Sequence, residues 1–284
     1  MPELAAILLY LRPTHADTIP AWTGRASHAW FLQSLQRLQP ELAAIVHDGD
    51  GPKPFTTSGL LGAESRGETV TLRPAVRYAL RVTTLHPDLT HITLNGLLPD
   101  WLAHGVTLHD QPFRVEAVST DPADDPRANA EDYTGLVART TLARNVPRQV
   151  TFTFASPTAF NKTGGLQVPL PVPELVFGSL IDRWSRFATV ALHPDLRQFV
   201  AECVAVSQHR IQTRRVSYER AGRGAVTGFT GTVTFSIQSG DQFWLGQVHL
   251  LAAFAMYSGV GVRTTMGMGQ ARAGAGELAQ SGER

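Results

Sequence analysis

The most distinctive chemical signal in the sequence is a glycine-rich stretch near its C-terminal end, from Ser258 to Gln270. Glycine has no Cβ, so backbone N–H groups in such a stretch can come close to a phosphate. The stretch follows an expected helix and lacks Gly-Lys-Ser/Thr, so it is neither a dinucleotide-binding fingerprint nor a Walker loop. The pattern predicts a loop that binds a phosphodiester, and a tightly packed structural turn is the alternative. The residues expected to contact the phosphate are Gly259, Gly261, Arg263, Thr264, Thr265, Gly267 and Gly269.

A second signal is a run of arginines between Ser207 and Gly224, where five arginines stand against one acid, Glu219. On a β-hairpin, alternating arginines can line one face and neutralise consecutive phosphates of a nucleic acid. Lys162, in the polar loop 161–165, is a further candidate, although a charged loop is often only a solvated surface. The predicted contacts of the hairpin are Arg210, Arg214, Arg215, Tyr218, Arg220 and Arg223.

Histidine is the side chain best suited to proton transfer near pH 7. His28 falls in the first turn of an expected helix, where the partial positive charge of the helix end favours the neutral imidazole. It also shares a helix sector with Phe31 and Leu32, so a histidine at the edge of the core is the alternative. His47, in an acidic turn, and His15, in the loop before the helix, are weaker candidates.

Nothing in the sequence suggests a metal site or a bound cofactor. The pairs His86/His91 and His104/His109 lack a third ligand at a convincing spacing. The single cysteine, Cys203, excludes an internal disulfide and a cysteine zinc site. We therefore expect chemistry carried by side chains alone.

Composition gives the class of protein. The chain has 284 residues, 43% of them hydrophobic and 17% charged, which is typical of a folded globular protein and excludes wholesale disorder. The net charge is +1, but residues 1–138 carry 10 basic and 16 acidic side chains (−6), whereas residues 139–284 carry 15 and 8 (+7). The basic residues are nearly all arginine, which suits phosphate contacts, although a codon bias would have the same effect. No signal peptide or membrane span is expected, and we predict a cytoplasmic protein.

These candidate residues must be positioned by secondary structure, and hydrophobic patterning predicts an α+β protein. In the first half, the expected order is strand, helix, strand, strand, helix, strand, which is that of the ferredoxin-like βαββαβ unit. A second unit of the same outline follows a polar, proline-containing linker. The first unit is expected to have strands at 4–11, 53–61, 76–85 and 112–118 and helices at 23–38 and 88–98. The second is expected to have strands at 149–155, 211–218, 228–237 and 266–271, helices at 174–188 and 241–257, and a helical or helix-to-strand stretch at 196–206. The expected domain limits are 1–118, a linker at 119–132, 133–273, and a flexible tail at 274–284.

Several segments in order resemble the CRISPR-associated endoribonucleases of the sixth Cas family, which cut repeat RNA to make guide RNAs. The similar segments span most of the chain. They are Lys53–Ser58, Phe154–Phe160, Pro171–Leu180 with Arg183-Trp184, Gly228–Gly231 and the glycine-rich stretch. The resemblance implies two tandem ferredoxin-like domains of the repeat-associated mysterious protein (RAMP) superfamily, with a hairpin and a groove that grip RNA.

The resemblance also implies a reaction: metal-independent attack of a ribose 2′-OH, leaving a 2′,3′-cyclic phosphate and a 5′-hydroxyl. Such a reaction needs a base, an acid and positive charge near the transition state. His28 matches the place on the first helix where the family usually keeps its catalytic histidine. Lys53, Arg25 and Ser27 are the expected partners of His28, and the sequence leaves the choice among them open.

The expected partner is therefore CRISPR repeat RNA. A second copy of the chain or subunits of an interference complex are further partners that the resemblance suggests. The alternative function is a non-catalytic RNA-binding scaffold in such a complex, because the same superfamily supplies scaffold proteins. Replacement of His28 separates the two readings, since a scaffold does not need this histidine.

Overall fold

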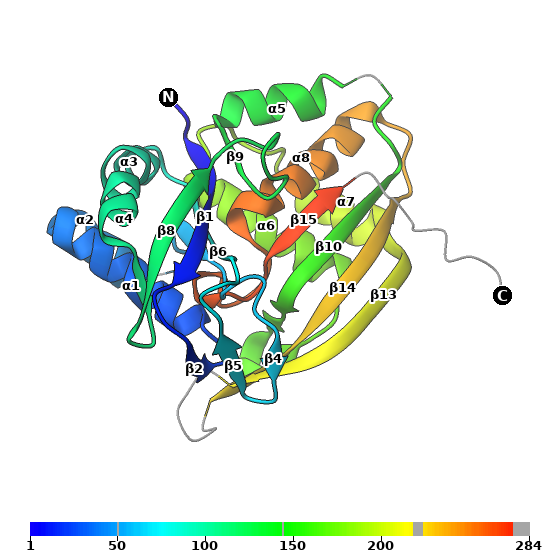
Figure 1. Ribbon diagram of the computed structural model, residues 1–284. Coiled ribbons are helices and arrows are strands. Elements are labelled where there is room, and N and C mark those ends of the chain that lie inside the picture. Colours follow the sequence, from blue (N-terminus) through cyan, green and yellow to red (C-terminus); the bar gives the residue numbers. More distant parts are fainter. Residues whose placement is uncertain (50, 144, 218–223, 275–284) are drawn as a thin grey trace.

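The computed structural model describes residues 1–49, 51–143, 145–217 and 224–274. In Figure 1 the N-terminal half, in blue to green, lies beside the C-terminal half, in green to red, and each half carries its own antiparallel sheet. The predicted residues Tyr218, Arg220 and Arg223, together with nearly all of the predicted tail, fall outside the described residues.

The first sheet is built around β1, whose run of apolar residues is buried over most of its length. The sheet has the order β3-β6-β1-β8-β7, with β9 paired to the start of β1. Its first four strands have the order of a ferredoxin-like fold, as predicted. The elements of this half are β1 (Leu4–Pro13), α1 (Gly24–Leu38), α2 (Pro40–Asp48), β3 (Phe55–Thr57), β6 (Tyr78–Thr84), α3 (Pro87–Ile92), the π-helix η1 (Thr93–Leu97), α4 (Leu98–His104), β7 (Val106–Leu108), β8 (Gln111–Ser119) and β9 (Asn129–Glu131).

A small three-stranded sheet, absent from the sequence-based prediction, lies at the end of this half. It has the order β2-β5-β4. Its strands are β2 (Asp17–Pro20), β4 (Ser65–Arg66) and β5 (Thr69–Leu72). Strand β9 falls within the segment 119–132 that was expected to be a linker, so part of that segment belongs to the first sheet.

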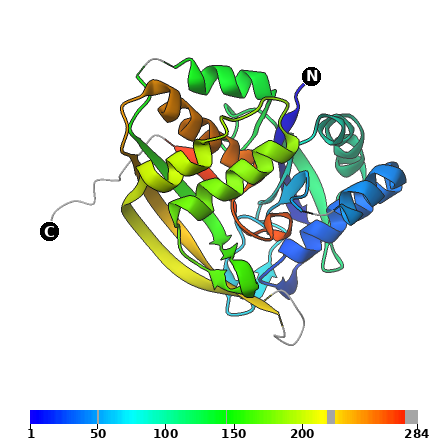
Figure 2. The same cartoon turned by 180° about the vertical axis from the view of Figure 1, so that it is seen from behind.

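The second sheet has the order β13-β14-β10-β15, which again is ferredoxin-like. Helices α6 and α8 cover one face, as the view from behind in Figure 2 shows, and the large apolar side chains of β10 and β14 pack beneath them. The elements of this half are α5 (Tyr133–Thr141), β10 (Gln149–Thr158), β11 (Phe160–Asn161), the 3-10 turn η2 (Thr163–Gly165), β12 (Gln167–Val168), α6 (Pro173–Phe187), α7 (Leu196–Cys203), β13 (Val204–Ser217), β14 (Ala225–Ile237), α8 (Gln242–Ser258), the 3-10 turn η4 (Thr264–Met266) and β15 (Ala271–Gly274).

The two halves share packing across their contact. Leu4 and Ala6 of β1 belong to the hydrophobic core of the C-terminal half, because they lie on the sheet face turned away from α1. Arg81 of β6 is buried at the same contact and donates hydrogen bonds to the carbonyl of Arg127 (2.8 Å) and the side chain of Gln270 (3.0 Å). Burial lowers the pKa of Arg81 to about 10. The halves therefore form one continuous structure around α8.

Candidate functional site

His28 is the fifth residue of α1 and thus lies in its second turn, one turn later than predicted, with its ring half-buried between the first sheet and the glycine-rich loop. The imidazole stacks on Phe55 of β3, with ring centroids 5.6 Å apart. Burial lowers the pKa of His28 below its ordinary value, the backbone carbonyl of Thr265 acts in the opposite direction, and His47 and Lys53 lower it further. The neutral imidazole, which can accept a proton, is thus favoured at pH 7.

The glycine-rich loop, residues 259–269, packs directly on the N-terminal end of α1. A Cβ added to Gly24 would lie 1.9 Å from the carbonyl oxygen of Met266, so only glycine allows this approach. Gly267 has a φ of +85° and forms an isolated parallel bridge with Ser58, next to β3. The hydroxyl of Thr57 donates to the carbonyl of Thr265 at 2.7 Å. The loop and His28 are therefore brought together from opposite ends of the chain.

A buried arginine of α6 holds the other side of the loop. The guanidinium of Arg183 donates to the carbonyl of Gly261 (2.6 Å) and to the side chain of Thr264 (3.4 Å). It also bonds to the hydroxyl of Ser179, which in turn accepts from the N–H of Gly261 at 2.9 Å. Burial lowers the pKa of Arg183 to about 10. Because the guanidinium donates hydrogen bonds to two oxygens of the loop, it fixes the loop and adds positive charge beneath it.

The three predicted partners of His28 occupy different positions. The ammonium of Lys53 donates to the carbonyls of His47 (2.7 Å) and Gly49 at the end of α2, and it is close enough to lower the pKa of His28. Arg25 is exposed on the first turn of α1. Ser27 is fully buried, and its hydroxyl donates to the carbonyl of Thr23 at 3.1 Å. Its position therefore does not favour a role in contacting RNA.

Three of the predicted hairpin arginines, Arg210, Arg214 and Arg215, lie on β13 and are exposed. Arg214 and Arg215 pair with Gly228 and Thr227 of β14, and as neighbours on a strand they point to opposite faces of the sheet. Arg210, which pairs with Thr232, shares a face with Arg214. The expectation that the arginines line one face therefore holds for Arg210 and Arg214 but not for Arg215.

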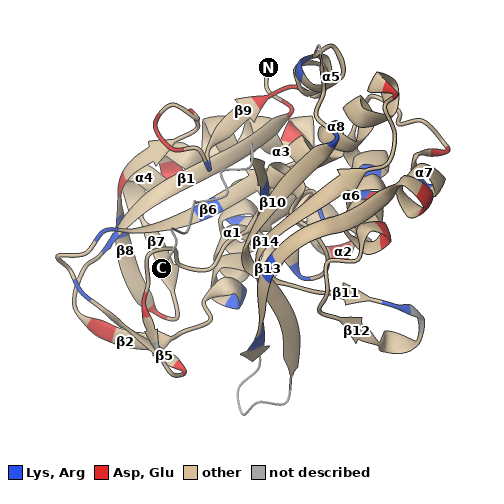
Figure 3. Ribbon diagram, turned by 90° about the vertical axis from the view of Figure 1, so that its right-hand side faces the viewer, with Lys and Arg blue, Asp and Glu red and all other residues tan. Residues whose placement is uncertain are grey.

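The hairpin reaches the loop through a small apolar cluster, which joins strand β14 to the start of α1. Val226 of β14 packs with Ala159, with Met268 of the loop and with Trp22, which precedes α1. Lys162 is exposed in the turn between β11 and β12, a projecting hairpin near the end of β13 and β14 in Figure 3. Strand β14 of the hairpin is thus in contact with the loop and with the start of α1.

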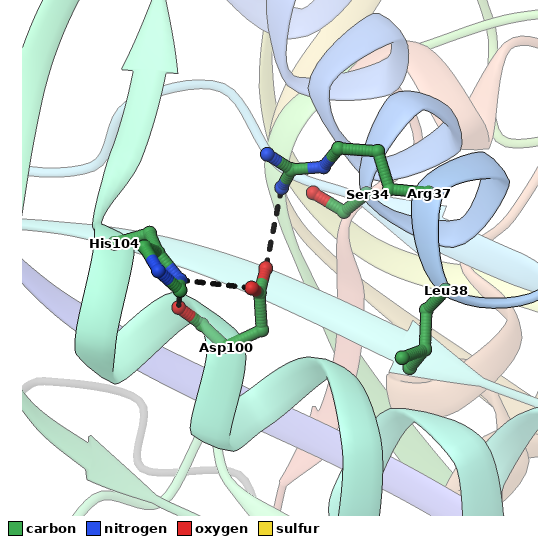
Figure 4. Close-up of a pocket in the computed structure, with 5 residues that line it drawn as sticks. All are labelled: Ser34, Arg37, Leu38, Asp100 and His104. Carbon is green, nitrogen blue, oxygen red and sulfur yellow. Dashed lines mark hydrogen bonds and ion pairs between the residues drawn. The ribbon is translucent and has the colours of Figure 1, made fainter.

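The other histidines named in the sequence analysis are weaker candidates for proton transfer than His28. His47 is exposed and pairs with the adjacent Asp48 at 2.8 Å, and His15 is exposed beside Thr14. His104 and Arg37 both form ion pairs with Asp100, in a pocket of about 180 Å³ between α1 and α4 that Figure 4 shows.

Within the described residues, no group of three or more His, Cys, Asp or Glu is arranged to hold a metal ion. In the same residues, no helix is long and apolar enough to cross a membrane.

Sequence reasoning missed the residues that support the site from below. Phe55 and Thr57 were noted only as part of a similar segment, although one stacks on His28 and the other holds Thr265. Arg183 and Ser179 were likewise noted only as part of a similar segment within an expected helix. An arginine on the buried face of an amphipathic helix was the signal available for Arg183, because a buried charge requires specific partners.

Comparison with known proteins gives consistent results. Residues 152–271 match the family model described as CRISPR-associated endoribonuclease Cas6. A Cas6 from Streptococcus thermophilus is 32% identical over 118 residues, which are 41% of this chain and 46% of the relative. A Cas6 from Mycobacterium tuberculosis is 28% identical over 72% of this chain and 64% of the relative. The matched regions thus span less than two thirds of these two curated relatives.

Solved structures match over nearly the whole chain. A Thermus thermophilus Cas6 in a product complex is 30% identical, with a TM-score of 0.78, and the match covers 96% of this chain and all of that chain. A second Cas6 product complex is 26% identical, with a TM-score of 0.73 and coverage of 96% and 99%. A RAMP protein that binds different RNA substrates is 12% identical with a TM-score of 0.56, which bears on the fold alone. The tandem ferredoxin-like fold of this chain, its glycine-rich loop and these matches together show that the chain belongs to the Cas6 family of CRISPR-associated endoribonucleases.

Proposed function

We propose that the protein cuts CRISPR repeat RNA by attack of a ribose 2′-OH on the adjacent phosphate, without a metal ion. The observation that carries the proposal is the position of His28. A half-buried imidazole with a lowered pKa lies directly against a glycine-rich loop of the type that binds phosphates. The similar Cas6 structures in product and substrate-mimic complexes support RNA as the substrate.

In the proposed reaction, His28 takes the proton of the 2′-OH. The oxygen then attacks phosphorus, the bond to the 5′ oxygen breaks, and the leaving oxygen takes up a proton from solvent water, to which His28 later releases its own. The products are a 2′,3′-cyclic phosphate and a 5′-hydroxyl. Because His28 gains a positive charge in the first step, its stacking on Phe55 and the nearby carbonyl of Thr265 stabilise the imidazolium.

Positive charge near the phosphate comes from the loop and from α1. We assign this role to Arg263 of the loop, to Arg25, and to Lys53. The ammonium of Lys53 has three donors, of which two bond to carbonyls of His47 and Gly49, so the third has no acceptor among the described residues and can turn to the RNA. We assign Ser27 no part in the reaction, since it is buried.

The RNA partner would extend from the loop along the hairpin, where Arg210 and Arg214 share a face. We place this reaction in the cytoplasm, where CRISPR transcripts are made. A second copy of the chain or subunits of an interference complex would bind surfaces that leave the junction of loop and α1 open.

The test is cleavage of the cognate repeat RNA in EDTA by wild type and by His28→Ala, with RNA binding measured in parallel. We expect cleavage by wild type, a loss of at least a hundredfold in the variant, and unchanged binding, because proton transfer contributes roughly 10²–10⁴-fold. Product ends are identified by mass spectrometry, in which the cyclic phosphate is distinct. Tight binding without cleavage by wild type would favour the scaffold function, and undiminished cleavage by His28→Ala would remove His28 from the mechanism.

A further inference from the structure

The N-terminal half carries a cluster of arginines that the proposed reaction does not use. Glu116 of β8 accepts from Arg12 at 2.5 and 3.2 Å and from Arg114 at 3.2 Å, and Arg77 lies 3.9 Å from the same carboxylate. One carboxylate therefore stands among three guanidinium groups. We call these four residues the Glu116 cluster. Its local charge is +2, in the half of the chain whose total is −6.

The cluster is held in place by the sheet. The register of β1 against β8 shifts between Tyr10 and Leu11, so Glu116 is the extra residue of a β-bulge, a feature that redirects a side chain. Arg77 lies over the ring of Tyr10, with 4.1 Å from its guanidinium carbon to the ring centroid. The hydroxyl of Tyr10 donates to Asp125 at 3.1 Å. The position of Glu116 is thus set by the bulge, and that of Arg77 by the ring of Tyr10.

The cluster is also open to solvent. The side chains of Arg77 and Arg114 are 48% and 71% exposed, whereas that of Glu116 is 21% exposed. The carboxylate therefore lies deeper than two of the cations, which face outward with an excess of positive charge. Figure 3 shows basic positions beside the β8 label, apart from those of the loop between β11 and β12. This arrangement suits an anionic partner.

The cluster lies on the same sheet face as the contact between the halves. Ser58 forms a bridge with Gly267 of the loop and lies beside Arg81 on the neighbouring strand β6. Arg81 in turn pairs with Leu8 of β1, and Tyr10 lies two residues further along β1 on the same face. With about 4.8 Å between strands and 3.4 Å per residue, Ser58 and Tyr10 are about 12 Å apart. This is a straight-line separation, because Arg81 and Leu8 between them are buried, and RNA that contacts both the loop and the cluster would pass over the residues that cover them.

We propose that the Glu116 cluster is a second RNA-contact surface, in which Arg77 and Arg114 bind backbone phosphates of a single-stranded part of the substrate. This inference rests on the proposed function, because it takes the substrate to be RNA. Glu116 limits the affinity of the surface by neutralising one of its three cations. Removing an arginine of the cluster should therefore lower the affinity for RNA, and removing the carboxylate of Glu116 should raise it.

The experiment measures binding of the repeat RNA, with its single-stranded flanks, as a function of salt. Each lost contact with single-stranded RNA lowers the slope of log K against log salt by about 0.7, which is about fivefold in affinity at 0.1 M salt relative to 1 M. We expect this loss for Arg77→Ala and for Arg114→Ala. The matched control is Arg37→Ala, which removes a similarly exposed, ion-paired arginine from the helical side of the same half.

A second pair of variants tests the sign. Glu116→Gln should bind the RNA more tightly, because it frees the charge of its arginines. Asp100→Asn makes the same change around Arg37 and His104 (Figure 4) and should leave binding unaltered. Thermal denaturation of all five proteins confirms that each remains folded.

The outcomes separate this inference from the proposed function. If wild type binds and cleaves RNA but Arg77→Ala and Arg114→Ala match Arg37→Ala, the second surface is overturned alone. An equal gain for Glu116→Gln and Asp100→Asn would also overturn it, because the gain would then reflect net charge. If wild type binds no repeat RNA, both proposals fail together.

Discussion

The contact between Gly24 and the glycine-rich loop gives a prediction with a magnitude. In Gly24→Ala, the new Cβ would lie 1.9 Å from the carbonyl oxygen of Met266, 2.5 Å from its carbon and 3.1 Å from the nitrogen of Gly267. An ordinary contact begins at about 3.4 Å, so α1 and the loop must separate by about 1.5 Å. All three atoms belong to the backbone, so a side-chain rotation cannot relieve the clash.

This separation moves His28 relative to Thr265 and the bound phosphate. A misplacement of 1 Å at a reacting centre can cost about 10²-fold in rate, which corresponds to about 2.7 kcal/mol of transition-state stabilisation. We expect Gly24→Ala to cleave about a hundredfold more slowly than wild type under saturating protein. The substitution itself is not unfavourable for a helix, since alanine is the better helix former by about 1 kcal/mol in a helix interior. The loss would therefore come from the clash.

The assay is single-turnover cleavage of labelled repeat RNA, with thermal denaturation and RNA binding recorded for each protein. Gly59→Ala is the matched control, because it lies beside the same junction and its new Cβ would be no closer than 3.4 Å to any neighbour. The control should cleave within about twofold of wild type, since its new contacts are ordinary ones. Cleavage by a folded Gly24→Ala within a few-fold of wild type would refute the reasoning that close packing of α1 on the loop sets the reaction geometry.

Three further predictions concern charges. The pKa of His28 is lowered in the folded state, so the folded protein loses stability relative to the unfolded chain as the pH falls below about 6.5. In urea denaturation, the free energy of unfolding of wild type should therefore fall relative to that of His28→Gln between pH 7.5 and pH 5. Arg183→Met leaves loop carbonyls unpaired and should lower the free energy of unfolding by about 2–4 kcal/mol in urea, with Arg183→Lys recovering part of it. Because Arg214 and Arg215 point to opposite faces, only one of their alanine variants should reduce the salt slope of RNA binding, by about 0.7–0.9, and equal losses would contradict a single RNA path.

Much of the fold could be predicted from the hydrophobic pattern of the sequence, because in the longest strands and helices that pattern agrees with the structure they adopt. The apolar run of β1 and the long helix α8 were predicted close to their observed ends, and the order of strands and helices gave the tandem ferredoxin-like class. Short edge elements were missed. Helix α2 and the small β2-β5-β4 sheet have too few residues to show a period, and tertiary contacts decide their structure. The predicted last strand was misplaced, because residues 264–266 form a 3-10 turn and β15 begins only at Ala271.

The candidate site could be predicted only in part. His28 and the glycine-rich loop carry local signals, a histidine near the start of a helix and closely spaced glycines, and the structure brings them together. The supporting contacts carry no such signal. Nothing in the sequence near Thr57 indicates that its hydroxyl meets a carbonyl 208 residues away, and Arg183 reveals its role only when α6 is placed against the loop. Partners that the fold brings together from distant segments lie beyond any local pattern.

Hydrogen bonds hold both the end of α8 and the glycine-rich loop that follows it. The last carbonyls of a helix lack partners within it and carry partial negative charge. Here the carbonyl of Met256 accepts from Arg81, and that of Tyr257 accepts from the hydroxyl of Thr83 at 2.5 Å. Arg183 holds the loop that follows from the opposite side. Arg183 thus holds the loop from within the C-terminal half, whereas Arg81 of the N-terminal half holds the end of α8 from which the loop starts, so packing of the two halves positions the loop relative to His28.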